Sequence, residues 1–179
     1  MGQETTGPAR IVQDEAAYSV RSSLRVPASA EDAFRVFTAR LSDWWVQEYT
    51  WSGPDALADI GIEPWQGGMA YEIGPYGFRS DWGRVTTWQP ARRLLFSWQI
   101  GPDRAPVPDP ARASEVEVRF SPEDGYTRVE VEHRGFDRHG DDAEGYRQAL
   151  TAGWHELLSR YADAVQRYAN PAAPCAAQE

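Results

Sequence analysis

A long amphipathic helix is predicted at the C-terminal end of the chain, over Asp142 to Tyr168, and it limits the folds that the chain can adopt. Its apolar and aromatic residues recur at spacings of three and four, which places them on one helical face. At 1.5 Å per residue such a helix is roughly 40 Å long, enough to span a whole twisted sheet. Gly153 within it costs about 1 kcal/mol relative to alanine, which indicates a close approach of a strand or of a ligand. The face consists of Tyr146, Leu150, Gly153, Trp154, Leu157, Tyr161, Val165 and Tyr168.

The segments before this helix predict β-strands, because apolar and polar residues alternate in them with a period of two. The first strand covers Tyr18 to Val26 and ends at Pro27. Gly67-Gly68 and Asp124-Gly125 are typical of hairpin turns. Six further strands are expected over residues 59–65, 69–74, 78–88, 94–100, 115–120 and 126–134.

Two short helices are predicted after the first strand. Ser29 is a candidate N-cap with an acid, Asp32, three residues later, and Phe34 and Phe37 mark the buried face of the first helix. A second helical turn is expected over residues 41–45. The order of strand, two short helices, six strands and one long helix predicts an α+β fold. In this fold a curled antiparallel sheet wraps around the long C-terminal helix.

The length of 179 residues is typical of one domain with a sizeable core. Nothing repeats internally, and no linker divides the chain. We therefore expect a flexible leader over residues 1–16, one domain over residues 17–168 and a flexible tail over residues 169–179.

Charge and composition exclude several classes of protein. The net charge is −9, and all 18 basic residues are arginine. Basic patches of the kind that nucleic-acid binders carry are missing, so we expect no nucleic-acid partner. Without a lysine, Schiff-base chemistry and a P-loop are excluded. No apolar run approaches the ~18 residues of a membrane span, and the single Cys175 excludes an internal disulfide. We expect a soluble, cytoplasmic protein, whose oligomeric state the sequence leaves open.

An aromatic hairpin from Trp82 to Trp98 holds three of the eight tryptophans. Its turn is residues 89–92, where Pro90 presets φ at the second turn position. In the second strand, every other residue from Leu94 to Ile100 is apolar, so one face of the strand is apolar. This face is either part of a packed core or the wall of a ligand cavity.

A set of short motifs is scattered along the chain between about residues 17 and 168. The motifs are Asp43-Trp44-Trp45, Gly67-Gly68 before Tyr71-Glu72, Gly83-Arg84-Val85 leading to Pro90, Arg93-Leu94, Trp98, Ser114-Glu115-Val116, Thr127-Arg128-Val129, Glu132-His133 and Gly153-Trp154. Together they resemble the START-like (SRPBCC) superfamily with its helix-grip fold, and within it the branch named after activators of the Hsp90 ATPase. The resemblance implies that residues 17–168 form a START-like ligand-binding domain.

A narrower resemblance rests on the run from Val131 to Gly140, together with Trp44-Trp45 and Gly67-Gly68. These residues are similar to those of self-resistance proteins from producers of enediyne antibiotics. Such proteins bind the reactive natural product in the cavity of the fold, and some are cleaved by it at a glycine. The resemblance implies a hydrophobic, polycyclic small molecule as the partner, with no cofactor.

Six residues are the candidate ligand-binding residues of the cavity. Trp has a large flat surface and one N–H donor, which suits a site for flat apolar molecules as well as a core. For His133, two interpretations stay open: a core histidine with satisfied hydrogen bonds, or a polar group in the cavity wall that orients a ligand or acts as an acid or base. The six are Trp44, Trp45, Trp82, Trp98, His133 and Trp154.

The other histidines do not predict a metal or catalytic centre. His139 is expected in a solvated loop, and His155 on the polar face of the long helix. His155-Glu156 begins like a metalloprotease helix, but Ser159 stands where the second histidine is needed. The sequence contains no nucleophile elbow, so we assign no catalytic and no metal-binding residue.

Three functions are compatible with these features. The first is a non-catalytic binder of an enediyne-type or polyketide-type natural product, for self-resistance or for carriage. The second is a polyketide cyclase or aromatase, which requires His133 or a nearby acid to project into the cavity. The third is an interaction protein similar to an Hsp90 cochaperone, which requires a large exposed apolar patch. The fold hosts all three, so the site has to decide between them.

Overall fold

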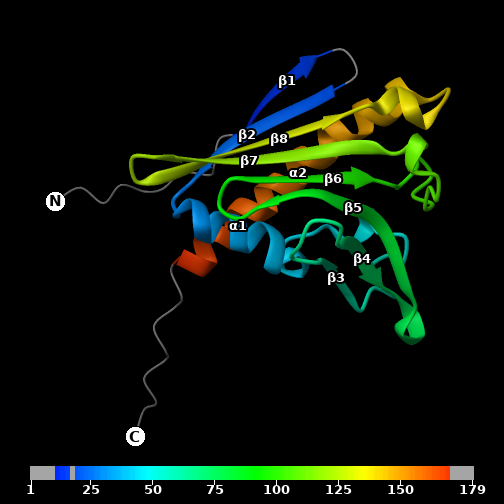
Figure 1. Cartoon of the computed structure of the whole chain (residues 1–179), viewed down its shortest axis with the longest axis horizontal. Helices are drawn as coiled ribbons and strands as arrows, with labels where there is room; N and C mark the ends of the chain where they lie inside the picture. Colours follow the sequence, from blue (N-terminus) through cyan, green and yellow to red (C-terminus); the bar gives the residue numbers. More distant parts are fainter. Residues whose placement is uncertain (1–10, 17–18, 170–179) are drawn as a thin grey trace, which may run out of the picture.

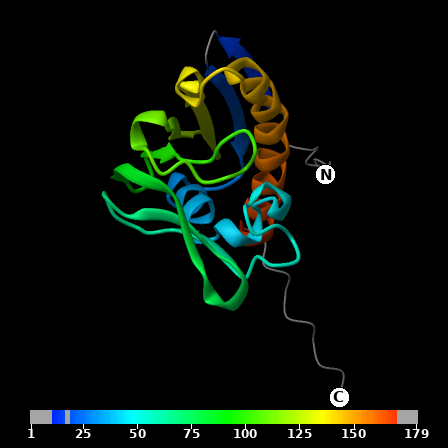
Figure 2. The same ribbon diagram turned by 90° about the vertical axis from the view of Figure 1, so that its right-hand side faces the viewer.

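The computed structural model describes residues 11–16 and 19–169, and of residues 12–16 it describes the backbone only. One antiparallel sheet of eight strands curves around a long helix, α2, as Figures 1 and 2 show. The predicted α+β helix-grip fold is confirmed. In chain order, the main elements are β1 (Val12–Ala16), β2 (Ser19–Val26), α1 (Ala30–Ala39), β3 (Asp59–Ile62), β4 (Met69–Ile73), β5 (Arg79–Gln89), β6 (Arg93–Trp98), β7 (Ser114–Glu123), β8 (Tyr126–Arg134) and α2 (Ala143–Ala169).

The sheet has the strand order β1-β2-β8-β7-β6-β5-β4-β3. Strand β2 therefore pairs with β8, the last strand of the chain, whereas every other pair of neighbouring strands is consecutive in the sequence. The register shifts between Ala70 and Tyr71 on β4 and between Val85 and Thr87 on β5. Such irregularities bend a strand and increase its twist, and here they lie where the sheet turns away toward β3 and β4.

Local sequence signals explain most of these elements. The Ser29 hydroxyl caps α1 by accepting a hydrogen bond from the amide of Asp32 at 3.1 Å. Asp124 and Gly125 form the two-residue turn between β7 and β8, and Gly125 has the positive φ of 71° that such a turn requires. Alternate residues of β6 and β8 are buried, as their period of two predicts.

Short 3-10 turns supply the remaining connections. The predicted second short helix is η1 (Leu41–Asp43), followed by η2 (Gln47–Tyr49). The segment after β6, expected as one long loop, contains η4 (Pro110–Arg112) and is pinned by a bridge between Ile100 and Pro106. The turns η3 (Pro75–Gly77) and η5 (Phe136–His139) precede β5 and α2.

Several boundaries differ from the sequence prediction by a few residues, and two of the differences have a clear physical cause. Val12–Ala16, expected within the flexible leader, forms β1 and pairs along β2, because backbone pairing at a sheet edge needs no apolar period. β3 ends at Ile62, three residues before the predicted end, because Pro64 cannot donate to the ladder. Residues 1–10 of the predicted leader and 170–179 of the predicted tail lie outside the described residues.

The core lies between the curved sheet, α1 and α2. From α2 it contains Trp154, Leu157 and Tyr161, each at most 1% exposed. Facing residues of β2, β6, β7 and β8 complete it. Among the described residues, no helix combines the length and the apolar character needed to cross a membrane.

Candidate functional site

The six predicted ligand-binding residues lie together in one buried aromatic cluster. Trp44 and Trp45 follow η1, Trp82 is on β5, Trp98 on β6, His133 on β8 and Trp154 on α2, and each is at most 5% exposed. The ring of Trp45 lies 5.7 Å from Trp44, 5.4 Å from Trp82 and 6.0 Å from Trp98, measured between centroids. Trp98 in turn lies 5.0 Å from His133 and 6.0 Å from Trp154. The rings fill the space between the sheet and α2 (the aromatic cluster).

Two indole donors of the aromatic cluster have no acceptor among the described residues. The N–H groups of Trp45 and Trp82 are buried and make no hydrogen bond to any described residue. By contrast, Trp44 donates to the carbonyl oxygen of Val36 at 3.1 Å, and Trp98 donates to the hydroxyl of Tyr146 at 2.8 Å. A buried donor without an acceptor costs about 1–3 kcal/mol, and such groups are rare in proteins. The two donors are therefore places where a bound molecule could add an acceptor.

His133 is a core histidine with both ring nitrogens in hydrogen bonds. Trp154 donates from Nε1 to Nδ1 of His133 at 3.1 Å, and Nε2 of His133 lies 2.7 Å from Oγ of Ser114. The ring is fully buried, and Phe136 packs against it at 4.5 Å. Burial, and after it the neighbouring His139, lowers the pKa of His133 well below its usual value. His133 is thus neutral at pH 7, and its nitrogens are already engaged within the protein.

His139 extends this network toward the surface, and the prediction that it is solvated was wrong. Its Nε2 lies 2.8 Å from the same Ser114 oxygen, and the residue is only 8% exposed. The edge of the His139 ring packs at 4.9 Å against Tyr146, whose hydroxyl donates to the carbonyl oxygen of Ile100 at 2.7 Å. Burial, and after it the charge of Arg112, lowers the pKa of His139. Trp154, His133, Ser114 and His139 form the histidine–serine chain.

A pocket of about 410 Å³ opens beside His139, beneath the segment that connects β6 to β7. Its volume falls within the range of small-molecule sites, about 300–1,000 Å³. We call it the loop pocket. The connecting segment is tied to the segment before β3, because Arg104 donates from Nη1 to the carbonyl oxygen of Glu48 at 2.5 Å. The pocket is lined by Gly101, Pro102, Asp103, Ala105, Pro106, Val107, Pro108, Asp109, Arg112 and His139.

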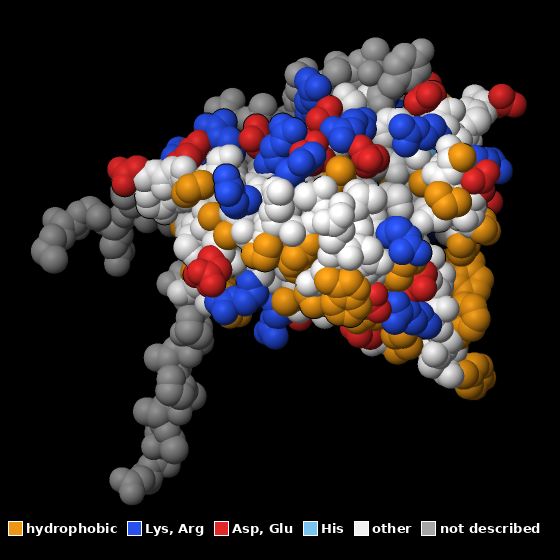
Figure 3. Space-filling view, in the orientation of Figure 1, with side chains coloured by type: hydrophobic (Ala, Val, Ile, Leu, Met, Phe, Trp, Pro, Cys, Tyr) orange, Lys and Arg blue, Asp and Glu red, His pale blue; other side chains and the backbone are white. Residues whose placement is uncertain are grey.

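Two other hollows lie away from the aromatic cluster. A groove of about 710 Å³ runs between α1 and α2 beside Arg40, Asp43 and Arg167. A third hollow, of about 360 Å³, lies on the outer face of the sheet over β2, β7 and β8, where Figure 3 shows basic and acidic side chains side by side. None of the six predicted residues lines the loop pocket or either of these hollows.

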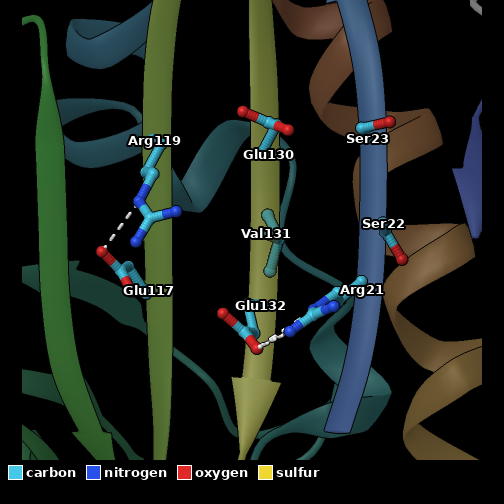
Figure 4. A pocket seen from close by; sticks show the side chains of 8 residues that line it. All are labelled: Arg21, Ser22, Ser23, Glu117, Arg119, Glu130, Val131 and Glu132. Carbon is cyan, nitrogen blue, oxygen red and sulfur yellow. Dashed lines mark hydrogen bonds and ion pairs between the residues drawn. The ribbon is translucent and has the colours of Figure 1, made fainter. Parts of the chain in front are cut away.

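The outer hollow is organised by ion pairs. Figure 4 shows Arg21 of β2 pointing at Glu132 of β8, at 3.0 Å, and Arg119 at Glu117 within β7, also at 3.0 Å. Glu117 is 2% exposed and also pairs with Arg93 and Arg134. Burial alone would raise the pKa of Glu117, but the arginine hydrogen bonds outweigh it and lower the pKa. The buried carboxylate of Glu117 is thus paired with arginines on three sides, which indicates that this group supports the sheet.

The described residues contain no group of three histidine, cysteine or carboxylate side chains that could hold a metal ion. The structure places the six predicted residues in one cluster, and their role in ligand binding stays a prediction; the sequence analysis missed Ser114 and His139. A signal for Ser114 was available. The two-residue Asp124-Gly125 turn places Val116 opposite His133, so Ser114, two residues earlier, faces the same side as a diagonal neighbour. No comparable signal pointed to His139, whose position depends on η5.

Comparison with known proteins agrees with this architecture. A family model described as "Activator of Hsp90 ATPase homolog 1-like protein" matches residues 27–166. One similar solved structure is Txn09, described as an anthrahydroquino-γ-pyrone synthase complexed with SUM. It has 39% sequence identity and a TM-score of 0.59, over 82% of this chain and 96% of Txn09.

Two more distant structures share the fold. CalU16 from Micromonospora echinospora has 18% identity and a TM-score of 0.55, over 91% of this chain and 88% of CalU16. MLL2253 from Mesorhizobium loti has 18% identity and a TM-score of 0.60, over 83% and 97% of the two chains. Among curated proteins, no significant match was found.

Proposed function

Starting from the fact that this chain belongs to the Activator of Hsp90 ATPase homolog 1-like family, we propose that it binds a polycyclic aromatic natural product that carries oxygen acceptors. The ligand lies between the curved sheet and α2, in contact with the aromatic cluster. Its flat rings pack against tryptophan faces, and its carbonyl or hydroxyl oxygens accept hydrogen bonds from the indole donors.

One observation carries this proposal: the N–H donors of Trp45 and Trp82 are buried without an acceptor among the residues that the structure describes. Their rings lie 5.4 Å apart at an angle of 35°, so both donors belong to one site. An apolar ligand would leave these donors unpaired, whereas a carbonyl oxygen would satisfy one or both. A quinone or a polyketide-derived ring system offers both the flat surface and the carbonyl oxygen that this site requires.

Binding requires side chains to move, because the aromatic cluster is closed to solvent. Trp45 directly precedes the segment 46–53, and Trp98 directly precedes the segment 99–113. Among the described residues, three side-chain hydrogen bonds hold these segments to each other and to α2: Arg104 to the Glu48 carbonyl, the Tyr49 hydroxyl to Glu156 and the Tyr146 hydroxyl to the Ile100 carbonyl, the last two at 2.7 Å. The first segment is also tied to β4, because Glu72 accepts from the amides of Trp51 and Ser52. Segments held by separate side-chain hydrogen bonds open at lower free energy than a continuous ladder of backbone hydrogen bonds, so in this proposal they form the entrance.

Calorimetric titration with 1-hydroxyanthraquinone tests the proposal. We expect binding to the wild type, and an approximately 3-fold to 10-fold weaker Kd in Trp45→Phe and in Trp82→Phe, which lose the donor and keep an aromatic ring. Trp65→Phe is the matched control, because Trp65 is 53% exposed and lies outside the cluster. No binding to the wild type, or equal Kd values in all three variants, would refute the proposed site.

A second candidate function is ring closure on the bound molecule. It is favoured by the 39% identity to a protein described as an anthrahydroquino-γ-pyrone synthase. A γ-pyrone forms when a phenol oxygen adds to the remote carbonyl carbon of an adjacent 1,3-diketone. The phenol proton passes to that carbonyl oxygen, the resulting hydroxyl leaves as water with a proton of the central CH₂ group, and no oxidant is needed.

The two candidates are separated by a reactive probe, 1-hydroxyanthraquinone with an acetoacetyl side chain at carbon 2. Conversion of the probe to the pyrone with the loss of one water, monitored by absorbance and by mass spectrometry, indicates a cyclase. Binding of the probe without acceleration of the closure above the rate in buffer indicates a binder that serves self-resistance or carriage.

A further inference from the structure

The donor and the acceptor of each hydrogen bond in the histidine–serine chain follow from the chemistry of Trp154, where the chain begins. An indole nitrogen can only donate, so Nδ1 of His133, 3.1 Å from Nε1 of Trp154, must accept. Neutral His133 therefore carries its proton on Nε2 and donates it to Oγ of Ser114, 2.7 Å away. The tautomer of His133 is thereby set by Trp154.

The same reasoning determines the tautomer of His139. Ser114 is fully buried and has a single hydroxyl proton. Since its oxygen already accepts from His133, the proton is left to donate to Nε2 of His139, 2.8 Å away. Neutral His139 then carries its own proton on Nδ1. Four residues on β8, β7, η5 and α2 thus form one chain of donors that ends at this N–H group.

The end of the chain meets the loop pocket. His139 is one of the residues that line this pocket, and its Nε2 is occupied by Ser114. Its Nδ1 makes no hydrogen bond to any described residue, which leaves it as the ring nitrogen available to a molecule in the pocket. A buried network of three residues that presents one oriented N–H donor to a pocket resembles the preorganised donors that stabilise negative charge in transition states.

We propose that His139 is a catalytic residue that donates a hydrogen bond from Nδ1 to a carbonyl oxygen of the substrate's diketone side chain. The side chain enters the loop pocket while the ring system stays against the aromatic cluster, and Tyr146, which contacts both Trp98 and His139, lies between the two. Ser114, His133 and Trp154 are positioning residues that hold His139 in the required tautomer. The inference rests on the ring-closing function considered above. As the phenol oxygen adds to the remote carbonyl carbon, negative charge develops on the carbonyl oxygen. His139 stabilises this charge without giving up its proton, so the balance of the reaction is unchanged.

The surroundings of His139 favour this neutral donor. Arg112 of η4 lines the loop pocket together with His139, Arg138 precedes His139 in the sequence, and Tyr146 of α2 packs against the ring. Asp103 and Asp109 are the carboxylates that line the loop pocket. The pKa of His139 is lowered, by burial first and by Arg112 second, so the imidazole is neutral at pH 7. A neutral imidazole that acts as an electrophile is an established way to polarise a carbonyl group.

The tautomer can be tested without any ligand. The chain has three histidines, so nitrogen-15 spectra of the full-length protein are simple to assign with His133→Gln and His139→Gln. At pH 7 we expect the Nδ1–H form for His139 and the Nε2–H form for His133. In Ser114→Ala and in Trp154→Phe the Nδ1–H form of His139 should lose its dominance, whereas the exposed-site control His155→Gln should keep it. An Nε2–H form of His139 in the wild type would overturn the proposal.

The catalytic role is tested with the acetoacetyl probe. We expect His139→Phe to lower kcat by about 10²–10³-fold, as when an oxyanion donor is removed, with the Kd for 1-hydroxyanthraquinone within about 3-fold of the wild type. Ser114→Ala should lower kcat less and also leave this Kd unchanged. If 1-hydroxyanthraquinone does not bind, the proposed function fails and the assignment of His139 fails with it. If it binds, but the wild type closes no ring or His139→Phe keeps the full rate, only the assignment fails.

Discussion

The same substitution, glycine to alanine, should have opposite effects on stability at Gly83 and at Gly153. At Gly83 of β5, an added Cβ would lie 2.3 Å from the backbone carbonyl oxygen of Ser97 on β6. This is more than 1 Å inside the roughly 3.5 Å at which nonbonded heavy atoms attract. The obstacle is backbone, and Ser97 is held on both sides, since its hydroxyl accepts from the amide of Arg84 at 2.9 Å and β6 also pairs with β7.

At Gly153 of α2 the surroundings are open enough for a methyl group. The nearest atom to an added Cβ is Cε2 of Tyr49 at 3.6 Å, an ordinary van der Waals contact. Alanine also removes the helix-propensity cost of glycine, about 1 kcal/mol. The close approach that the sequence predicted at this glycine is therefore a contact with the Tyr49 ring that alanine tolerates.

The magnitudes follow from these contacts. Gly83→Ala forces β5 and β6 apart, and Trp82 and Trp98 of the aromatic cluster move with the strands. We therefore expect the free energy of unfolding to fall by about 3 kcal/mol, the upper end of the usual cost of overpacking. Gly153→Ala should raise the free energy of unfolding by about 1 kcal/mol. For a domain of this size these values correspond to a Tm about 6–12 °C lower and about 2–4 °C higher, respectively.

Urea unfolding followed by circular dichroism at 222 nm measures both variants against the wild type. The m-value should be the same in all three proteins, which makes the midpoints directly comparable. A loss smaller than about 0.5 kcal/mol for Gly83→Ala would refute the steric argument, since changes of that size are typical of surface substitutions. A destabilised Gly153→Ala would show that α2 approaches its neighbours more closely than the structure indicates.

Three further predictions concern charge and backbone. The pKa of Glu117 is lowered in the folded protein, so its ionised carboxylate stabilises the fold above the pKa of the unfolded chain. This stabilisation is lost as the pH falls through the folded pKa. In urea titrations, Glu117→Gln should therefore lower the free energy of unfolding more at pH 7 than at pH 3. The lowered pKa of His133 means that the unfolded chain takes up the proton first, so stability should fall as the pH drops from 7 to 5. His133→Gln should reduce this pH dependence to the part that His139 contributes, while His155→Gln retains it in full; equal slopes in all three proteins would contradict the assignment. Ala91 has a left-handed φ of 61°, so Ala91→Gly should raise the free energy of unfolding by up to about 1 kcal/mol in a thermal scan, and a lower Tm would argue against strain there.

The sequence by itself determined the elements and their order. Its period-two segments, its turn signals at Asp124-Gly125 and its period-3.6 C-terminal segment each report local backbone preferences, which depend on neighbours a few residues away. The predicted helix and the observed α2 differ by one residue at each end. The edge strand β1 was missed, since its pairing depends on β2 rather than on a pattern of its own.

Only the tertiary structure decided what the candidate residues do. Periodicity placed the tryptophans on inward faces, but whether an indole N–H finds an acceptor depends on residues distant in the chain. Trp98 meets Tyr146, whereas Trp45 and Trp82 meet no acceptor in the described part of the chain. Likewise, His139 was expected in solvent, because its position among three other elements leaves no local mark on the sequence. Hydrogen bonds across the core require several strands and a helix to arrive at one point, and that convergence is a property of the folded chain alone.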